Sequence, residues 1–417
     1  MKYAIWFVRL VFAAWMLPAG LNHFVPLFPQ PLGNEPLSRE LFRALFDSHL
    51  FDLVKAVELL AGISALTGFY TPLALVMCMP VSFCVWYWDT PLQGWGSLSS
   101  IYGWAVLGCN VLLCLSYLDR YRAMLLPLAR PRASGSPALV LGGRLIFGAW
   151  MVLNGISFFF MPILPASVGH QPLAVELMTA LVDSRLFHVA MAIQLVAGAL
   201  ILVGLFVPLA LCLIMPISVC AAYWAVILEH EPLGALLALV AVALNAALML
   251  AYLDRYRDML VRHAVAAGET TASCYEALFV DPRGGTARAA FIAALIPLAL
   301  AAAFYHWLVF GGSGTYAMLM LLFPAIVLHA RRLHDMGWSA RPLLIPAVPA
   351  AAAIWLHMVQ RSTGIERPAI PTALAVCAAV VLWGLIGKSR SEAGRPGEAA
   401  AVLGRSLLRR ESSGASR

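Results

Sequence analysis

Ionisable side chains gather at one place in this otherwise apolar sequence. Asp52, Lys55 and Glu58 follow one another at three-residue steps, and Asn22 and His23 stand at the end of the preceding apolar run. Residues three apart lie on one face of a helix, so the three charged groups form a polar stripe. If that helix begins near position 49 and crosses a bilayer, Glu58 lies roughly 13 Å inside the membrane. An ionisable group at that depth is costly and is by default a candidate for function.

Two interpretations of this cluster remain open. In the functional one, Glu58 is a proton acceptor or a hydrogen-bond partner for the polar head of a ligand. His23 is then a second proton site, because histidine titrates near neutral pH. In the structural one, Lys55 pairs with Glu58 or Asp52 within the helix, and the pair only fixes helix packing.

The composition is that of a protein embedded in a membrane. Of the 417 residues, 62% are hydrophobic and only 12% are charged, and the mean hydropathy is +0.84. A soluble domain carries about 25% charged residues, so a cytosolic enzyme is excluded. The net charge of +7 does not indicate nucleic-acid binding, because the basic residues lie in short segments between apolar runs. We therefore expect the lipid bilayer to be the main partner of the chain.

Apolar runs predict about twelve transmembrane helices and hence an all-α integral membrane protein. Helices are expected rather than strands because the bilayer offers no water to unpaired backbone groups. The predicted spans are 3–25, 50–68, 71–88, 98–118, 139–161, 186–205, 207–228, 233–252, 289–310, 314–330, 341–358 and 368–387.

The basic residues predict the orientation of these spans. Placing the N-terminus inside puts most of the 28 Lys and Arg residues in cytoplasmic loops, as membrane proteins prefer. We therefore expect a bacterial-type inner-membrane protein with both termini in the cytoplasm. The first apolar run also has features of a cleaved signal peptide. However, Arg9–Met16 recurs almost unchanged as Arg144–Met151, deep in the chain, which favours a retained first helix.

The chain contains two copies of one four-helix unit. Tyr117–Arg122 is identical to Tyr252–Arg257, and the copies cover about 1–128 and 139–262. An even number of spans in each copy gives both the same orientation, as two parallel bundles. Four further spans, at 279–390, show no similarity to the repeat and form a third domain.

The second copy is an internal control for the polar cluster of the first. In place of Asn22, His23, Asp52, Lys55 and Glu58 it has Ser157, Phe158, His188, Met191 and Gln194. The charged cluster is therefore absent from the second copy, which predicts one active copy and one scaffold copy. Residues kept in both copies, such as Asn110 and Asn245, are expected to serve helix packing.

Several segments of the first copy form a recognisable pattern. They are Arg9, Gly20–Phe24, Val57–Gly62 running on to Gly68–Pro72, and Tyr117–Tyr121. This pattern resembles the DoxX family, covering the first copy well and the second in degenerate form. DoxX-like proteins are small four-helix membrane proteins, and some are subunits of quinone-linked oxidoreductases such as thiosulfate-quinone oxidoreductase. The resemblance thus implies a quinone as ligand and a soluble redox enzyme as partner.

The third domain has one polar motif, Arg331–Ser339. Arg331 and Arg332 stand at the end of a span, where cations complement a helix C-terminus. In the alternative interpretation Arg331, Arg332, His334 and Asp335 form a cytoplasmic site for an anion or a lipid head group. The motif resembles the uncharacterised bacterial domain-of-unknown-function family eight-hundred-and-five. Residues 391–417, rich in Ser, Ala and Arg, are expected to be a disordered tail.

Motifs for metals, nucleotides and dithiol chemistry are absent from the sequence. The eight cysteines include no Cys-x-x-Cys pair, and the ten histidines show no metal-ligand spacing. No Gly-rich phosphate loop follows a strand. We therefore expect neither a metal nor a nucleotide cofactor, and a quinone stays the candidate.

The DoxX resemblance implies a membrane subunit of a redox complex that does not catalyse a reaction alone, whereas the residues by themselves indicate only an outward-facing ionisable cluster in one bundle. The ligand of such a subunit is expected to be a quinone or another small lipid-soluble molecule near His23 and Glu58. A small-molecule transporter or permease is the alternative, because twelve spans with parallel halves also suit a carrier. A third interpretation is a membrane scaffold without a ligand.

Overall fold

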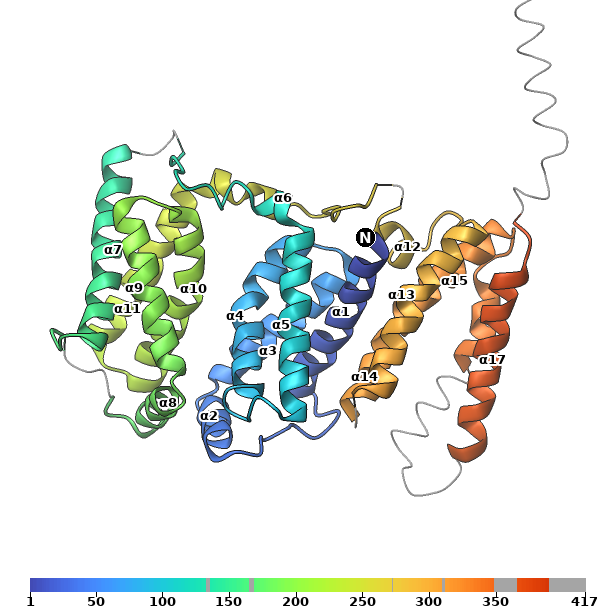
Figure 1. Ribbon diagram of the computed structural model, residues 1–417, viewed down its shortest axis with the longest axis horizontal. Coiled ribbons are helices and arrows are strands. Elements are labelled where there is room, and N and C mark those ends of the chain that lie inside the picture. The colour runs from blue at the N-terminus through green and yellow to red at the C-terminus, as the bar shows by residue number, and fades with distance from the viewer. Residues whose placement is uncertain (133–135, 165–168, 272, 310–311, 349–365, 390–417) are drawn as a thin grey trace, which may run out of the picture. The chain divides into compact units, whose positions relative to one another are not determined.

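The computed structural model describes the chain except for residues 133–135, 165–168, 272, 310–311, 349–365 and 390–417 (Figure 1). Within that described part every regular element is a helix, and Phe69 and His263 pair in an isolated bridge. The chain divides into two compact units, which are considered separately. The repeat unit comprises Val8–Ala267 and Val309–Ala317, and the C-terminal unit comprises Met1–Phe7, Gly268–Leu308 and Met318–Arg417.

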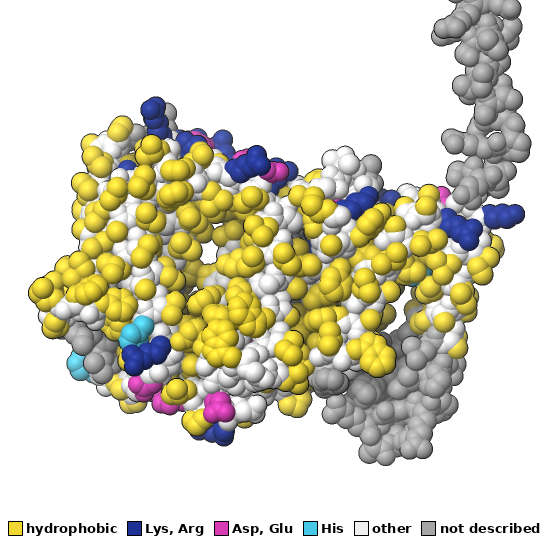
Figure 2. Space-filling model, in the orientation of Figure 1, with side chains coloured by type: hydrophobic (Ala, Val, Ile, Leu, Met, Phe, Trp, Pro, Cys, Tyr) yellow, Lys and Arg dark blue, Asp and Glu magenta, His cyan; other side chains and the backbone are white. Residues whose placement is uncertain are grey.

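Nine helices in the described residues are long and apolar enough to cross a membrane, so the chain is built as an all-helical, multi-pass membrane protein. Hydrophobic side chains cover the middle of the helices on the face shown in Figure 2, and Lys and Arg lie near the helix ends. Helix α3 (Leu50–Thr67) has the length of a span but is not among the nine, because it carries three charged residues, Asp52, Lys55 and Glu58. The predicted span 341–358 lies partly outside the described residues, so the count of twelve stays a prediction.

The first copy folds as a helical bundle. Its helices are α1 (Lys2–Phe24), α2 (Pro36–Asp47), α3, α4 (Thr71–Asp89), α5 (Leu98–Ser116) and the short α6 (Leu118–Tyr121). Helices α1 and α3 approach closely, because a Cβ on Gly20 or Gly62 would lie 2.6 or 2.5 Å from the backbone of the other helix. Small residues at such contacts let helices pack tightly within lipid. Gly68, whose φ is 85°, ends α3.

The second copy has the same order of helices. They are α7 (Pro137–Phe159), α8 (Pro172–Asp183), α9 (Leu186–Val203), α10 (Val207–Tyr223) with a π-helical extension (Trp224–Glu229), and α11 (Pro232–Ala251). Two 3-10 turns follow, at Leu253–Arg255 and Arg257–Met259. The sequence does not predict α2 and α8, because each is too short to span a membrane and lies between two spans.

The two bundles meet at one end through α2 and α8, which share a buried core of leucine and alanine side chains. Two hydrogen bonds cross this interface in opposite directions. The Tyr87 hydroxyl donates to the Ser184 carbonyl at 2.7 Å, and the Tyr223 hydroxyl donates to the Ser48 carbonyl at 2.9 Å. Tyr87 and Tyr223 occupy equivalent positions in the two copies, as do Ser48 and Ser184, so this contact is reciprocal.

At the other end the chain crosses from each bundle to its neighbour (Figure 1). We call residues 122–132 and 257–267, which follow the two bundles, the exchanged arms. The Tyr70 amide donates to the Arg262 carbonyl at 2.9 Å, and the Phe206 amide donates to the Pro127 carbonyl at 2.8 Å. Each bond joins the arm of one copy to a turn of the other. Such reciprocity is typical of two subunits around a two-fold axis, here within a single chain.

The C-terminal unit is built on α13 (Arg288–Trp307), α15 (Leu322–Asp335) and α17 (Glu366–Ile386), which pack on one another. The shorter elements are α12 (Tyr275–Phe279), which packs on α15, and a 3-10 turn (Arg341–Leu343). Most of the short helix α14 (Gly312–Met320) belongs to the repeat unit. The first turns of α1 belong to this unit. Trp6 is only 1% exposed, donates its indole N–H to the Glu269 carboxylate and meets Phe279 edge-on.

Candidate functional site

The structure brings His23 and Asp52 together at one end of the first bundle. His23 lies in the last turn of α1 and Asp52 in the first turn of α3, and Nε2 of His23 is 2.6 Å from Oδ1 of Asp52. The His23 side chain is 9% exposed, whereas that of Asp52 is 46% exposed. The carboxylate therefore connects a buried imidazole to the surface. A histidine–carboxylate pair of this kind can carry a proton between the surface and the buried side of the imidazole.

His49 is a second partner of Asp52 that the sequence analysis missed. Its Nδ1 lies 3.2 Å from Oδ2 of Asp52, and its side chain is exposed. His49 has a positive φ of 57° and forms the N-cap of α3. A histidine three residues before a carboxylate at a helix start is the signal that would have found it.

Aromatic rings enclose His23. The rings of Phe24, Phe46 and Phe51 meet the imidazole edge-on, with centroid distances of 5.1, 5.8 and 5.3 Å. Phe46 belongs to α2, so this unpredicted short helix helps to build the site. Apolar surroundings lower the local dielectric and strengthen the polar contacts made inside them.

Two buried polar atoms at this end of α1 have no hydrogen-bond partner among the described residues. They are Nδ1 of His23 and Nδ2 of Asn22. Asn22 is 3% exposed, and its Oδ1 accepts the amides of Leu27 and Phe28 at 2.8 and 2.7 Å. An unpaired buried polar atom costs about 1–3 kcal/mol, so a water or a ligand atom is expected to satisfy each.

Lys55 and Glu58 form an ion pair deeper in the same bundle. Nζ of Lys55 is 2.8 Å from Oε2 of Glu58, and the two side chains are 11% and 3% exposed. The ammonium group also lies 4.8 Å from the centre of the Phe51 ring. This pairing within α3 agrees with the structural interpretation of the stripe. Asp52 is engaged by the histidines, so the stripe divides into two separate polar contacts.

The second bundle lacks both contacts. Phe158 replaces His23 and packs edge-on against His188, the counterpart of Asp52, at a centroid distance of 4.9 Å. Met191, the counterpart of Lys55, is buried and apolar. Ser157 keeps part of the Asn22 role, because its hydroxyl accepts the Leu164 amide at 2.8 Å.

Two polar residues that recur in both copies, Asn110 and Arg9, form hydrogen bonds in the first bundle. Nδ2 of Asn110 donates to the Ser82 hydroxyl at 2.8 Å, and Asn110 is fully buried. The counterparts Asn245 and Ser218 have side-chain polar atoms without partners in the described residues. Arg9 is also fully buried, and its Nε donates to the Ala65 carbonyl at 2.8 Å near the end of α3. Both roles concern helix packing.

The polar motif of the C-terminal unit forms a network with the backbone. Nε of Arg331 donates to the Thr286 hydroxyl at 3.0 Å. Arg332 is fully buried, donates to the Gly384 carbonyl at 2.9 Å near the end of α17, and pairs with Asp335. His334 lies at the surface, with Nδ1 3.3 Å from the Gly284 carbonyl. Arg331 thus holds the loop before α13, and Arg332 joins α15 to the end of α17.

No family model, curated protein or solved structure matches this chain. Among the described residues no three His, Cys, Asp or Glu side chains gather in a way that could hold a metal ion.

Proposed function

We propose that the chain is the membrane subunit of a redox complex and binds a quinone, or a lipid-soluble molecule with a similar head, near His23. The observation that carries the proposal is the pair of buried atoms without partners, Nδ1 of His23 and Nδ2 of Asn22. A quinone head is a flat apolar ring with carbonyl oxygens that accept hydrogen bonds. Asn22 offers an amide N–H for such an oxygen, and the phenylalanine rings around His23 offer apolar contact.

The His23–Asp52 pair supports the proton part of quinone chemistry. Reduction of a quinone to a quinol takes two electrons and two protons. The electrons would come from a soluble redox enzyme, the partner that the DoxX resemblance implies. His23 is placed to give a proton to a quinone oxygen and to regain it through the exposed Asp52 carboxylate.

The second bundle supports this proposal by contrast. It has the same order of helices but carries Phe158 and Ser157 where the first bundle has His23 and Asn22. It therefore lacks the imidazole and the amide at these two positions. Its own imidazole, His188, stands at the Asp52 position and lies 3.0 Å from Arg185, so no carboxylate there joins an imidazole to the surface. The distribution of Lys and Arg supports an inner-membrane location with cytoplasmic termini, which puts His23 near the outer surface.

A pair of matched substitutions tests the proposal. His23→Phe gives the first bundle the residue that the second already has, and His188→Phe makes the same chemical change in the second bundle. Purified full-length protein in detergent is titrated with a short-chain benzoquinone in a calorimeter. Loss of one hydrogen bond of about 1–1.5 kcal/mol weakens binding about tenfold, so His23→Phe should bind about tenfold more weakly. His188→Phe should bind like the unchanged protein.

Equal affinity of both variants would remove His23 from the site. A complete lack of quinone binding by the unchanged protein would exclude the redox proposal and favour a transporter or a scaffold. Uptake of small molecules into vesicles would then separate these two.

A further inference from the structure

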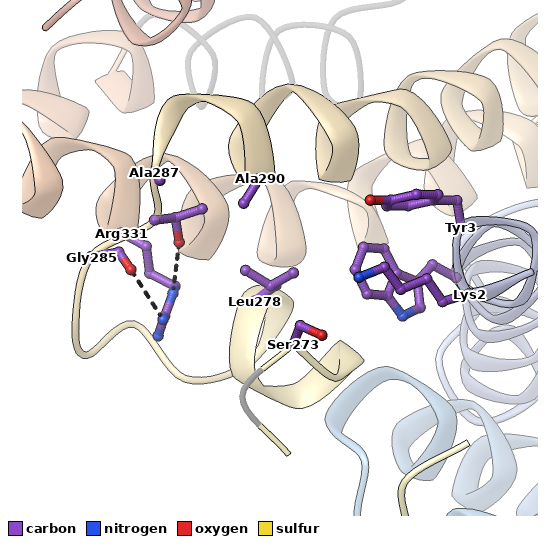
Figure 3. Close-up of a pocket in the computed structure, with 10 residues that line it drawn as sticks. Lys2, Tyr3, Ser273, Leu278, Gly285, Ala287, Ala290 and Arg331 are labelled. Carbon is purple, nitrogen blue, oxygen red and sulfur yellow. Dashed lines mark hydrogen bonds between the residues drawn. The ribbon is translucent and has the colours of Figure 1, made fainter. Parts of the chain in front are cut away.

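The C-terminal unit contains a pocket that the quinone proposal does not use. Its volume is about 150 Å³, and it is partly open to the surface. Figure 3 shows Lys2 and Tyr3 on one side, Arg331 and Gly285 on the other, and Ala290 and Leu278 between them. Two cationic side chains more than 300 positions apart in the sequence thus line one cavity.

Of the two cations, Lys2 is the better placed to contact a bound anion. Its ammonium group lies 5.3 Å from the centre of the Tyr3 ring and 5.7 Å from that of Trp6. These cation–π contacts hold the side chain at the pocket without neutralising its charge. Lys2 can therefore add a charge-assisted hydrogen bond to an anion.

Arg331 is held rigidly but keeps its charge. Its guanidinium donates to the Thr286 hydroxyl and to the carbonyls of Asp281, Arg283 and Gly285, all neutral oxygens. The Asp281 side chain accepts the Arg283 amide at 3.0 Å and also interacts electrostatically with Arg331.

Two other acids lie near the pocket. Glu269 is engaged by the Trp6 indole and, at 3.2 Å, by the Tyr275 amide. Asp335 lies close to Gly285 and pairs with Arg332. Each of these acids therefore has a protein partner of its own.

The start of α13 also lines this cavity. Ala287 is the N-cap of this helix and gives no side-chain cap, and Ala287 and Ala290 line the pocket. The first amides of a helix have no partner within the helix and carry a partial positive charge. An anion at such a position can accept from them directly.

The pocket also lies at the level where membrane spans begin and end. It is lined by the first turn of α1, the first turn of α13 and the last turns of α15, each part of a candidate span. In the orientation that the distribution of Lys and Arg predicts, these ends face the cytoplasm, where anionic lipids are found. Lipid head groups occupy this depth, so an anion bound here is within reach of the bilayer.

We propose that this pocket binds the phosphate of an anionic membrane lipid. Lys2 and the first amides of α13 contact the phosphate oxygens, and Arg331 keeps the loop before α13 in place and adds positive potential. The acyl chains then run along the apolar surface of the spans. This site is independent of the quinone proposal, because it uses none of the residues around His23.

Native mass spectrometry of the full-length protein in neutral detergent tests the lipid site. The probe is dioctanoyl phosphatidic acid, with dioctanoylglycerol as the same lipid without phosphate and inorganic phosphate as the anion without lipid. Lys2→Gln removes a charge and should weaken binding of the probe about fivefold. Ala290→Leu fills the cavity and should abolish it. Arg122→Gln, which removes an exposed cation of the repeat unit, should leave binding unchanged.

Three results would overturn the proposal. Dioctanoylglycerol binding as tightly as the probe would show that the phosphate is not recognised. Unchanged binding by both Lys2→Gln and Ala290→Leu would place the lipid elsewhere. Inorganic phosphate binding as tightly as the probe would replace the lipid with a soluble anion as the ligand.

Discussion

Replacing Glu58 with glutamine, while Lys55 stays, leaves an ammonium group buried in the first bundle. In the intact protein Lys55 and Glu58 are 2.8 Å apart, and both side chains are almost fully buried. Breaking a buried ion pair by removing one partner costs about 3–5 kcal/mol, because the other charge loses its compensation. The Phe51 ring, 4.8 Å from the ammonium group, still attracts the cation and offsets part of this cost. We therefore expect Glu58→Gln to lower the free energy of unfolding by about 3 kcal/mol.

The second bundle supplies the compensated control. It carries Met191 and Gln194 at the two positions, so Lys55→Met combined with Glu58→Gln copies a pair that already folds in this chain. Replacing a buried ion pair with apolar or neutral groups of similar size is often neutral or stabilising. The double variant should therefore unfold within about 1 kcal/mol of the unchanged protein, well above the single variant.

The unchanged protein, Glu58→Gln, Lys55→Met and the double variant form a double-mutant cycle. Denaturant unfolding in detergent micelles, followed by circular dichroism, measures the stability of all four. The coupling free energy is expected to be about 5 kcal/mol, because each single variant leaves one buried charge and costs about 3 kcal/mol, whereas the double variant costs about 1 kcal/mol. Gln194→Ala, at the matching position of the second bundle, should cost less than about 1 kcal/mol because no charge loses a partner. The reasoning is refuted if Glu58→Gln alone is as stable as the double variant, since Lys55 would then not depend on Glu58.

Three further outcomes are expected. Gly20→Val should lower the melting temperature, because its side chain would meet the α3 backbone and such overpacking costs about 1–3 kcal/mol, whereas Gly108→Ala has open space and should leave it unchanged. Tyr223→Phe should cost about 1 kcal/mol of unfolding free energy, measured by the same denaturant titration, because the Ser48 carbonyl loses its donor. Burial raises the pKa of the Cys274 thiol, so at pH 8 this thiol should react with a maleimide more slowly in the folded than in the unfolded protein. Equal rates in the folded and unfolded protein would contradict this.

The sequence predicts the helices well where a long apolar run decides the structure. The predicted span 50–68 corresponds to α3, Leu50–Thr67, because the run ends at Gly68, whose positive φ terminates the helix. The composition correctly indicates an all-helical membrane protein. The pairing of Lys55 with Glu58 also follows from their spacing, since residues three apart meet on one helix face.

The sequence alone does not predict contacts between segments that are far apart in the chain. Nothing in local periodicity places Arg262 beside Tyr70, because that bond depends on how two complete bundles meet. The contact of His23 with Phe46 is missed for a similar reason, since α2 is too short to be read as a span.

The exchanged arms also determine the order in which contacts form while the chain is being synthesised. The ribosome completes the first bundle long before Arg262, the residue that pairs with the turn at Tyr70, has been made. At about 5–20 residues per second, the stretch from the end of the first copy to Arg262 takes about 7–30 s to translate. During that time the first bundle waits in the membrane with its inter-bundle contacts unmade. Because both halves belong to one polypeptide, the arm then arrives at high effective concentration, and pairing does not depend on how much protein the membrane contains.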